Sequence, residues 1–426
     1  MKVHSRPTDA PTFTGALEIM SHRRAVAFVL LLSISYSFNG MDRQVFPALL
    51  PAISDEYGFS LSRGGLLTNV FAVTLAAAGL LSGWLISRLG RKRVLVWGLA
   101  SYSVFTLLTP FGQNFGQLLG LRALTGFGEA LHIATIFAIV GAFFGAKRGA
   151  YMGVVNSFFG VGSFLGPYFG ARIFEATESW RIPFIVFGVA GLVSALAILL
   201  IVPTVFTESQ DSETVPVQPD GSQGALRFIN ANSVGCLTAF GLMGFAFFSY
   251  ASLYPTFLKT ALDFTPVQAG TAFGMYGIGA LSAVFLGWVG EKLRKIGLIA
   301  TLLMLAGTGA MIFLVVETFV LQAVWSCLFG ALVSGYLYPS FVAMSQRCVP
   351  AHRIGHVMSL LLVCFYLPGV AAGAVFGKLA DSYGWGPAAT IVVVAPPLVS
   401  AVIVVLLNPL KVRGAKATDG LTLAVD

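Results

Sequence analysis

Residues 184–202 read Phe-Ile-Val-Phe-Gly-Val-Ala-Gly-Leu-Val-Ser-Ala-Leu-Ala-Ile-Leu-Leu-Ile-Val, a stretch without a single charged side chain. An α-helix needs about 20 apolar residues to cross a hydrocarbon core of about 30 Å. A membrane-spanning β-strand would instead alternate polar and apolar residues over about 10 positions, and this stretch shows no such alternation. It therefore predicts a transmembrane α-helix.

The same pattern runs along the whole chain. Of 426 residues, 56% are hydrophobic and 10% are charged, whereas soluble domains carry about 25% charged residues. Apolar runs predict twelve helices, numbered here 1 to 12, at 26–51, 63–87, 94–111, 115–144, 149–174, 183–203, 231–257, 268–290, 296–315, 318–346, 355–380 and 386–409. The first run is too long for a signal peptide, so we expect it to remain as helix 1.

The net charge of +8 comes from basic residues in short clusters between the apolar runs. Most of them fall on one side if both termini are cytoplasmic, which the positive-inside rule favours. Because no face combines basic and aromatic residues, we expect no nucleic-acid partner. The sequence predicts a multi-pass, monomeric protein of the inner (plasma) membrane, with the lipid bilayer around it and both termini cytoplasmic.

The chain divides into two similar halves. The stretch Gly83-Trp-Leu-Ile-Ser-Arg-Leu-Gly-Arg-Lys-Arg after helix 2 is echoed by Gly287-Trp-Val-Gly-Glu-Lys-Leu-Arg-Lys after helix 8. We expect a cytoplasmic tail at 1–25, a six-helix bundle at 26–203, a cytoplasmic linker at 204–230, a second bundle at 231–410 and a tail at 411–426. The predicted fold is an all-α membrane protein of twelve transmembrane helices in two pseudo-symmetric six-helix bundles, an arrangement typical of secondary transporters.

The loop after helix 2 resembles that of the major facilitator superfamily, G-x-L-(A/S)-D-R-x-G-R-(K/R)-x. The positions that match are Gly83, Leu85, Arg88, Gly90, Arg91 and Lys92. Ser87 stands where the family carries an Asp, which forms a latch to the neighbouring bundle. The resemblance implies the major facilitator fold and a gating loop made by Gly83, Arg88, Gly90, Arg91 and Lys92, with the latch in doubt.

Within that superfamily the chain is most similar to the anion:cation symporters, which couple organic anions to protons. Those carriers have an Asp-Arg pair in helix 1, matched here by Asp42-Arg43. They also have Arg-x-x-x-Gly-x-x-Glu in helix 4, matched by Arg122, Gly126 and Glu129. The resemblance implies that an organic anion and protons are carried together.

These four ionisable residues lie within predicted membrane helices, where a charged side chain is energetically unfavourable. A charged side chain at the centre of a membrane helix costs about 2.5–3.5 kcal/mol on insertion scales. Because Arg122 and Glu129 lie two turns apart on one helix face, we expect them to line one cavity at two depths. Gly126 and Gly128 would leave space there for a ligand. The alternative is two internal ion pairs that only hold helices 1 and 4 together.

Residue chemistry suggests how the four charges could act. An arginine keeps its charge and offers a planar fork to a carboxylate or sulfonate, whereas burial favours the protonated form of a carboxylic acid. We therefore expect proton binding at Asp42 and Glu129 to release Arg43 or Arg122, so that one of them captures the anion. His132 could relay protons, although a packing or hydrogen-bonding role is the alternative.

Further candidates for substrate binding are polar residues in apolar runs: Asn39, Asn156, Tyr250 and Tyr254. The alternatives are interhelical hydrogen bonds for the amides, and interfacial or core positions for the tyrosines. Phe158 and Phe365 occupy regions where some carriers of this family contact sugar hydroxyls. This difference predicts a substrate with fewer hydroxyls than a hexonate.

The sequence thus predicts a secondary active transporter that moves a small organic anion, a carboxylate or sugar acid, with protons by alternating access. A glycine-rich stretch ending in Gly166-Pro167-Tyr-Phe-Gly170 resembles a motif of antiporters, so an antiporter or efflux carrier is the alternative. No Ser/His/Asp set, metal-ligand spacing or phosphate-binding loop is present. We expect no enzyme activity, no catalytic residue, no metal and no cofactor.

Overall fold

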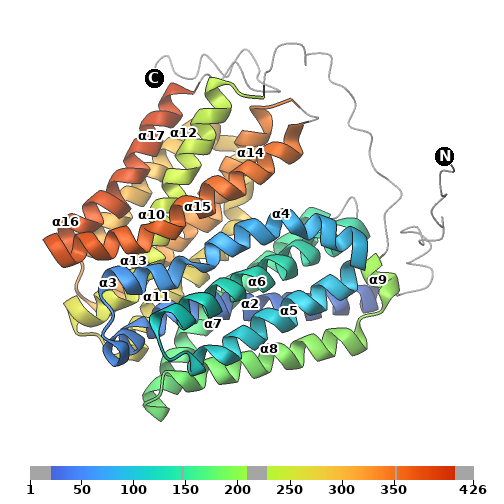
Figure 1. Cartoon of the computed structure of the whole chain (residues 1–426). Coiled ribbons are helices and arrows are strands. Elements are labelled where there is room, and N and C mark those ends of the chain that lie inside the picture. The colour runs from blue at the N-terminus through green and yellow to red at the C-terminus, as the bar shows by residue number, and fades with distance from the viewer. Residues whose placement is uncertain (1–20, 145–147, 209–227, 351–352, 408–426) are drawn as a thin grey trace.

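The computed structural model describes residues 21–144, 148–208, 228–350 and 353–407, except the side chains of 80, 284, 287–294, 354 and 355. Helices joined by short turns make up almost all of this part of the chain (Figure 1). The predicted tails and most of the predicted linker lie outside the described residues. The first residues of that linker form a short helix, α9 (Thr204–Glu208), with Phe206 fully buried.

The first half begins with α2 (His22–Tyr57), which is longer than predicted at both ends. Predicted helix 2 is broken into α3 (Leu61–Asn69) and α4 (Phe71–Leu89). The other members are α5 (Arg91–Leu108) with the 3-10 turn η1 (Thr109–Phe111), α6 (Phe115–Phe144), α7 (Arg148–Thr177) and α8 (Arg181–Ile201). The break after Asn69 allows α3 and α4 to follow different neighbours.

The second half contains more interruptions. It comprises α10 (Ala231–Leu262), α11 (Pro266–Ala280), α12 (Ala283–Ala310), η4 (Met311–Val315), α13 (Phe319–Gly330), η5 (Ala331–Leu337), α14 (Tyr338–Arg347), α15 (Ile354–Tyr383), α16 (Trp385–Ala389), η7 (Thr390–Val394) and α17 (Ala395–Leu406). The segments η4, η5 and η7 are π-helical. A π turn adds a residue without changing hydropathy, so the apolar pattern does not reveal it.

Ten helices in the described residues are long and apolar enough to cross a membrane. Two further segments complete the twelve helices of the fold: α7, and α11 with the start of α12. Both are rich in glycine and pack against each other where the two halves meet, because Gly160 and Gly277 lie backbone to backbone. Small residues permit this close approach and reduce the apolar character of the two helices.

The two bundles meet at one end of the molecule and diverge at the other (Figure 1). The side that carries the start of α2 and the end of α17 is here named the terminal side, and the opposite one the distal side. On the distal side α3 packs along α15, and the backbones of Gly65 and Gly373 leave no room for a Cβ atom between them. This contact closes the distal side.

Two polar contacts join the halves near the same closure. Lys259 Nζ lies 2.5 Å from Asp55 Oδ2 at the distal ends of α10 and α2. Deeper inside, Asn69 Nδ2 donates to the carbonyl oxygen of Gly369 at 2.9 Å and, more weakly, to that of Phe248 at 3.3 Å. A buried amide that binds backbone of two opposing helices fixes their spacing without charge.

A cavity of about 680 Å³ lies between the bundles. It extends from Asn69, at the closure, to Ser82 and Gly83 at the terminal end of α4 and Ser359 near the terminal end of α15. Since the halves are sealed on the distal side and diverge on the other, the cavity opens toward the terminal side. The two halves thus enclose a cavity that is closed on the distal side and open on the terminal side.

Substitution of Gly65 tests the distal closure. In Gly65→Val the side chain would meet the backbone of Gly373, so we expect about a tenfold shift toward a conformation open on the distal side. Spin labels at the exposed distal residues Glu178 and Glu317, with the native cysteines replaced, measure this as a longer inter-bundle distance. Gly120→Val, which faces open space on α6, is the matched control. An unchanged distance in a folded Gly65→Val protein would contradict the seal.

Candidate functional site

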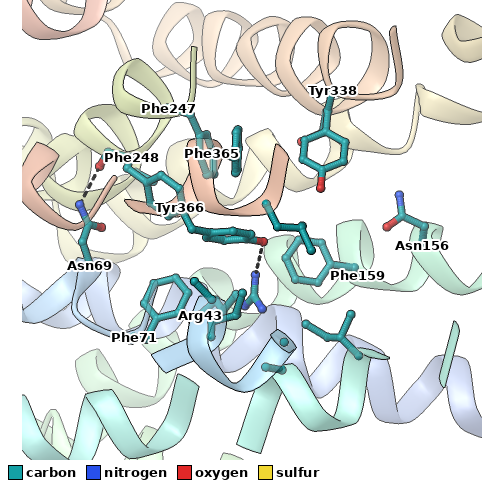
Figure 2. A pocket seen from close by; sticks show the side chains of 18 of the residues that line it. Arg43, Asn69, Phe71, Asn156, Phe159, Phe247, Phe248, Tyr338, Phe365 and Tyr366 are labelled. Carbon is teal, nitrogen blue, oxygen red and sulfur yellow. Dashed lines mark hydrogen bonds between the residues drawn. The ribbon is translucent and has the colours of Figure 1, made fainter. Parts of the chain in front are cut away.

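The walls of the cavity come from both bundles. The first half contributes α2, α3, α4, α6 and α7, and the second contributes α10, α11, η5, α14 and α15. Among the described residues that line the cavity, Arg43 on α2 is the only charged one. Its guanidinium points toward the second half, where the ring of Tyr366 lies (Figure 2). The chemistry of the cavity therefore centres on one arginine.

Arg43 connects the interior of the first bundle to the cavity. Its Nε donates to Glu129 Oε2 at 2.7 Å, and its Nη1 makes a long contact of 3.5 Å with the hydroxyl of Tyr366. The guanidinium carbon lies 5.3 Å from the ring centre of Phe71 and 5.5 Å from that of Phe159, within cation–π range. Nη2 has no hydrogen-bond partner in the described part of the chain. One nitrogen of this cation is therefore buried without a hydrogen-bond acceptor among the described residues.

A second ion pair lies deeper in the same bundle. Arg122 Nη1 is 3.2 Å from Asp42 Oδ2, and Thr106 Oγ1 donates to Asp42 Oδ1 at 2.5 Å. Arg122 also stacks over the ring of Phe46, 4.7 Å from its centre. Glu129 lies close enough to interact with both charges of this pair. The four ionisable residues therefore form one network between α2 and α6, in two pairs.

The prediction that Arg122 and Glu129 line the cavity at two depths is not supported. Both side chains are fully buried, and each pairs with a residue of α2 rather than facing the open space. Gly126 and Gly128 do not leave room for a ligand either. A Cβ on Gly126 would meet the backbone of Phe71, and one on Gly128 would lie 2.6 Å from the amide of Tyr102. These glycines let α6 pack closely on α4 and α5.

His132 and Asn39 lie behind the ion pairs, away from the cavity. Nε2 of His132 is 3.0 Å from Ser35 Oγ, and its ring packs 5.6 Å from that of Tyr102. Asn39 is fully buried on α2, and neither atom of its amide has a hydrogen-bond partner among the described residues. Neither residue is in a position to touch a ligand in the cavity.

Of the remaining candidates, Asn156 lines the cavity from α7 and faces it in Figure 2. Tyr250 and Tyr254 do not line it. The hydroxyl of Tyr250 lies 2.7 Å from Ser326 Oγ, and that of Tyr254 donates to Gln322 Oε1 at 2.8 Å. Both tyrosines are fully buried inside the second bundle, where they join α10 to α13. The expectation that they offer hydroxyls to a substrate is not supported by this placement.

The structure also reveals cavity residues that the sequence analysis missed. They are mostly aromatic and lie close to Arg43: Phe71, Phe159, Phe248 and Tyr366. Tyr366 precedes Pro368 in an apolar helix, and a polar group next to a helix-bending proline is a usable signal. The phenylalanines gave no signal, because an apolar side chain facing a cavity has the same hydropathy as one facing lipid.

The predicted gating loop lies at the terminal ends of α4 and α5. Gly90 adopts φ +83°, a backbone conformation that favours glycine. Glu208 on α9 accepts a hydrogen bond from the backbone N–H of Lys92 at 2.9 Å, and Arg91 Nη1 donates to the carbonyl of Thr207 at 3.3 Å. Arg88 is exposed over Trp84, and Gly83 lines the cavity mouth. In this state the loop is held by α9 of its own half.

Ser87, which replaces the usual Asp of the loop, donates to the carbonyl oxygen of Trp84 at 2.8 Å. This bond stays within α4 and makes no contact with the second bundle. A carboxylate does approach the loop, but it belongs to Glu208. It sits at the N-terminus of α5, where unpaired backbone N–H groups favour an anion.

Comparison with known proteins identifies a matching family and several related proteins. The family model described as Major Facilitator Superfamily matches residues 32–374. Protein spinster homolog 3 of Danio rerio is 28% identical over 60% of this chain, and the match spans about half of that protein, 53%. The hexuronate transporter of Bacillus subtilis (strain 168) is 26% identical over 54% of this chain and 56% of its own length. The multidrug efflux pump LfrA of Mycolicibacterium smegmatis is 30% identical over 46% of this chain and 38% of its own.

A solved structure agrees with the observed fold. It is the crystal structure of a bacterial homologue of the human lysosomal transporter Spinster, in an inward-facing and unoccupied conformation. It superposes with a TM-score of 0.70 at 16% identity, covering 91% of this chain and 96% of that one. At this identity the likeness concerns the fold. The predicted twelve-helix architecture and the predicted family resemblance are confirmed.

The buried pair of Arg122 and Asp42 provides a test of the network. Arg122→Met leaves a carboxylate buried without its partner, so we expect a loss of about 3–5 kcal/mol in the free energy of unfolding. The double variant Asp42→Asn with Arg122→Met should recover most of this loss, because no unpaired charge remains. Reversible unfolding of the purified protein in detergent measures the free energy of unfolding of the single and the double variant. A single variant as stable as the parent would contradict the pairing.

Proposed function

Because the chain belongs to the Major Facilitator Superfamily, we propose that it carries a small organic anion together with protons across the membrane by alternating access. One observation carries this proposal. Arg43 lines a cavity between the bundles, and its guanidinium pairs with Glu129 inside the first half while one of its nitrogens lacks a partner among the described residues. A proton on Glu129 and an anion on Arg43 are thereby linked.

The linkage follows from the charges. While Glu129 is ionised, it neutralises Arg43, and an anion gains little by binding. When Glu129 takes up a proton, the guanidinium has no counter-charge within the pair and attracts an anion more strongly. By reciprocity, a bound anion favours the protonated form of Glu129. Anion and proton thus bind together and are released together.

The deeper pair has a supporting role in this scheme. Asp42 is held by both Arg122 and Thr106, so it is a second proton site only after Arg122 has moved. We assign Arg122 to pairing and Arg43 to the anion. His132 lies on the same helix as Glu129 and its Nε2 is 3.0 Å from Ser35 Oγ, which favours the hydrogen-bonding role over a proton relay.

Alternating access uses the contacts between the halves. Arg43 and Tyr366 come from opposite halves and already meet at 3.5 Å, so an anion bound at Arg43 would contact both halves and favour their approach on the terminal side. The distal contacts at Gly65 and Asn69 would then part. With both termini in the cytoplasm of an inner (plasma) membrane, as the basic residues favour, the cavity described here opens inward. We expect a monomer to be sufficient, since one chain holds the whole site.

The relatives support transport but leave open whether the protein carries an organic anion inward or exports other compounds. The name of the hexuronate transporter describes an anionic solute, whereas that of LfrA describes multidrug efflux. The single arginine in the cavity favours an anion, and efflux of neutral or cationic compounds is the second candidate. The glycines at 160–170 do not decide between them, because they serve the packing of α7 on α2 and α11.

Transport in proteoliposomes tests the proposal. With an acidic exterior, we expect accumulation of a labelled carboxylate and simultaneous proton entry, reported by pyranine inside the vesicles. Glu129→Gln should abolish accumulation driven by the pH gradient but retain downhill exchange, because its side chain mimics the protonated acid. Arg43→Ala should abolish both, and the exposed Glu178→Gln is the control. Proton entry coupled to expulsion of a cationic dye instead would favour efflux.

A further inference from the structure

We propose that the carried anion is an aromatic acid, in which a flat ring lies between the aromatic walls of the two bundles and a single carboxylate or sulfonate binds Arg43. This inference rests on the proposed function and names its substrate class. It assigns the ring-binding role to Phe71 and Phe159 in the first half and to Phe248, Phe365 and Tyr366 in the second.

The first argument is the composition of the walls. Aromatic side chains line the cavity from both halves: Tyr36, Phe71, Phe137 and Phe159 on one side, and Phe247, Phe248, Tyr276, Tyr338, Phe365 and Tyr366 on the other. Aromatic rings prefer offset-stacked or edge-to-face partners with centres 4.5–7 Å apart. A cavity bounded by such rings on two opposing surfaces favours a flat unsaturated ligand over a saturated one.

The rings of the second half form one surface around Phe365. Its ring centre lies 5.6 Å from that of Phe248 and 5.3 Å from those of Tyr338 and Tyr366. Figure 2 shows this group facing Phe71 and Phe159 across the cavity, with Arg43 between them. The positive charge and the aromatic surfaces are therefore adjacent, as a ring that bears an acid group requires.

The second argument is that several polar groups of the wall already have partners. Three cavity residues bond within their own helix or half: Thr68 donates to Gly64 O at 3.1 Å, Ser82 to Gly79 O at 2.7 Å, and Ser334 is bonded to Tyr276. Asn69 is engaged by the carbonyls of the opposing half. The amides of Gln44 and Asn156 also line the cavity. They are few for a sugar acid, which has a hydroxyl on most carbons and would leave some of these groups without a partner.

The third argument is the number of charges. In the described walls Arg43 is the single charged side chain, so the cavity can neutralise one acid group. A second carboxylate would face aromatic rings and be desolvated without a partner. A cation would be repelled whenever Glu129 is protonated. A monovalent aromatic acid matches the one charged residue, the aromatic walls and the small number of polar groups that lack a partner.

Matched ligands test the proposal directly on the full-length protein in detergent. Benzoate and benzenesulfonate are compared with cyclohexanecarboxylate, which has the same charge and a saturated ring, and with gluconate, benzyl alcohol and benzylamine. Calorimetry at acidic pH should show benzoate binding about 3- to 10-fold more tightly than cyclohexanecarboxylate. Binding of gluconate, benzyl alcohol and benzylamine should be weaker still, and Arg43→Ala should remove binding of both aromatic acids.

Variants of Tyr366 separate the ring from the hydroxyl. Tyr366→Leu should weaken benzoate about 3- to 10-fold and change cyclohexanecarboxylate much less, whereas Tyr366→Phe should restore benzoate binding to near the parent value. Phe365→Leu provides a second ring deletion. Phe169→Leu, on the exposed face of α7, is the matched control and should leave all affinities unchanged.

The outcomes distinguish this inference from the proposed function. Equal binding of benzoate and cyclohexanecarboxylate, or tighter binding of gluconate, with loss in Arg43→Ala, would overturn the aromatic class and leave anion symport standing. Binding of benzylamine or benzyl alcohol that is independent of Arg43, without binding of any acid, would overturn both. Benzoate selectivity lost in Tyr366→Leu and kept in Tyr366→Phe would establish the aromatic site.

Discussion

The pairing of charge between α2 and α6 is the interaction on which the rest of this structure depends. A guanidinium inside a membrane protein is held only where carboxylates compensate it, and here two arginines and two carboxylates compensate one another. One pair is enclosed, and the other reaches the cavity through Arg43. The same residues thus stabilise the first bundle and, in the proposed function, also bind the anion and the proton, so that stability and ligand binding would depend on the same charges.

That pairing is possible because glycine lets the helices approach closely. Gly162 and Gly166 on α7 receive the backbone of α2 at Ser37 and Met41, and Gly126 receives the backbone of α4. With α2 fixed in this way, consecutive residues point in different directions: Asp42 toward α5 and α6, Arg43 toward the cavity. A single helix therefore serves both pairs.

The sequence predicted the helices and singled out the four ionisable residues, whose pairing it gave only as the alternative, because hydropathy and the cost of buried charge are local properties. It could not predict which face of α6 meets the cavity. The spacing of Arg122 and Glu129 places them on one face, but only the neighbouring helices determine that this face turns toward α2. For the same reason Tyr250 resembled a ligand group and is a core residue, whereas Phe248 resembled a core residue and lines the cavity. The apolar pattern also did not predict the helix break at Val70 or the π-helical segments.

The distal closure determines whether protons can leak through the protein. Gly65 and Gly373 touch through their backbones, and the amide of Asn69 fills the next layer with its donors already engaged. We expect such a closure to exclude a continuous chain of water, along which protons could cross the membrane without a transport cycle. A carrier closed in this way would conserve the membrane potential between turnovers.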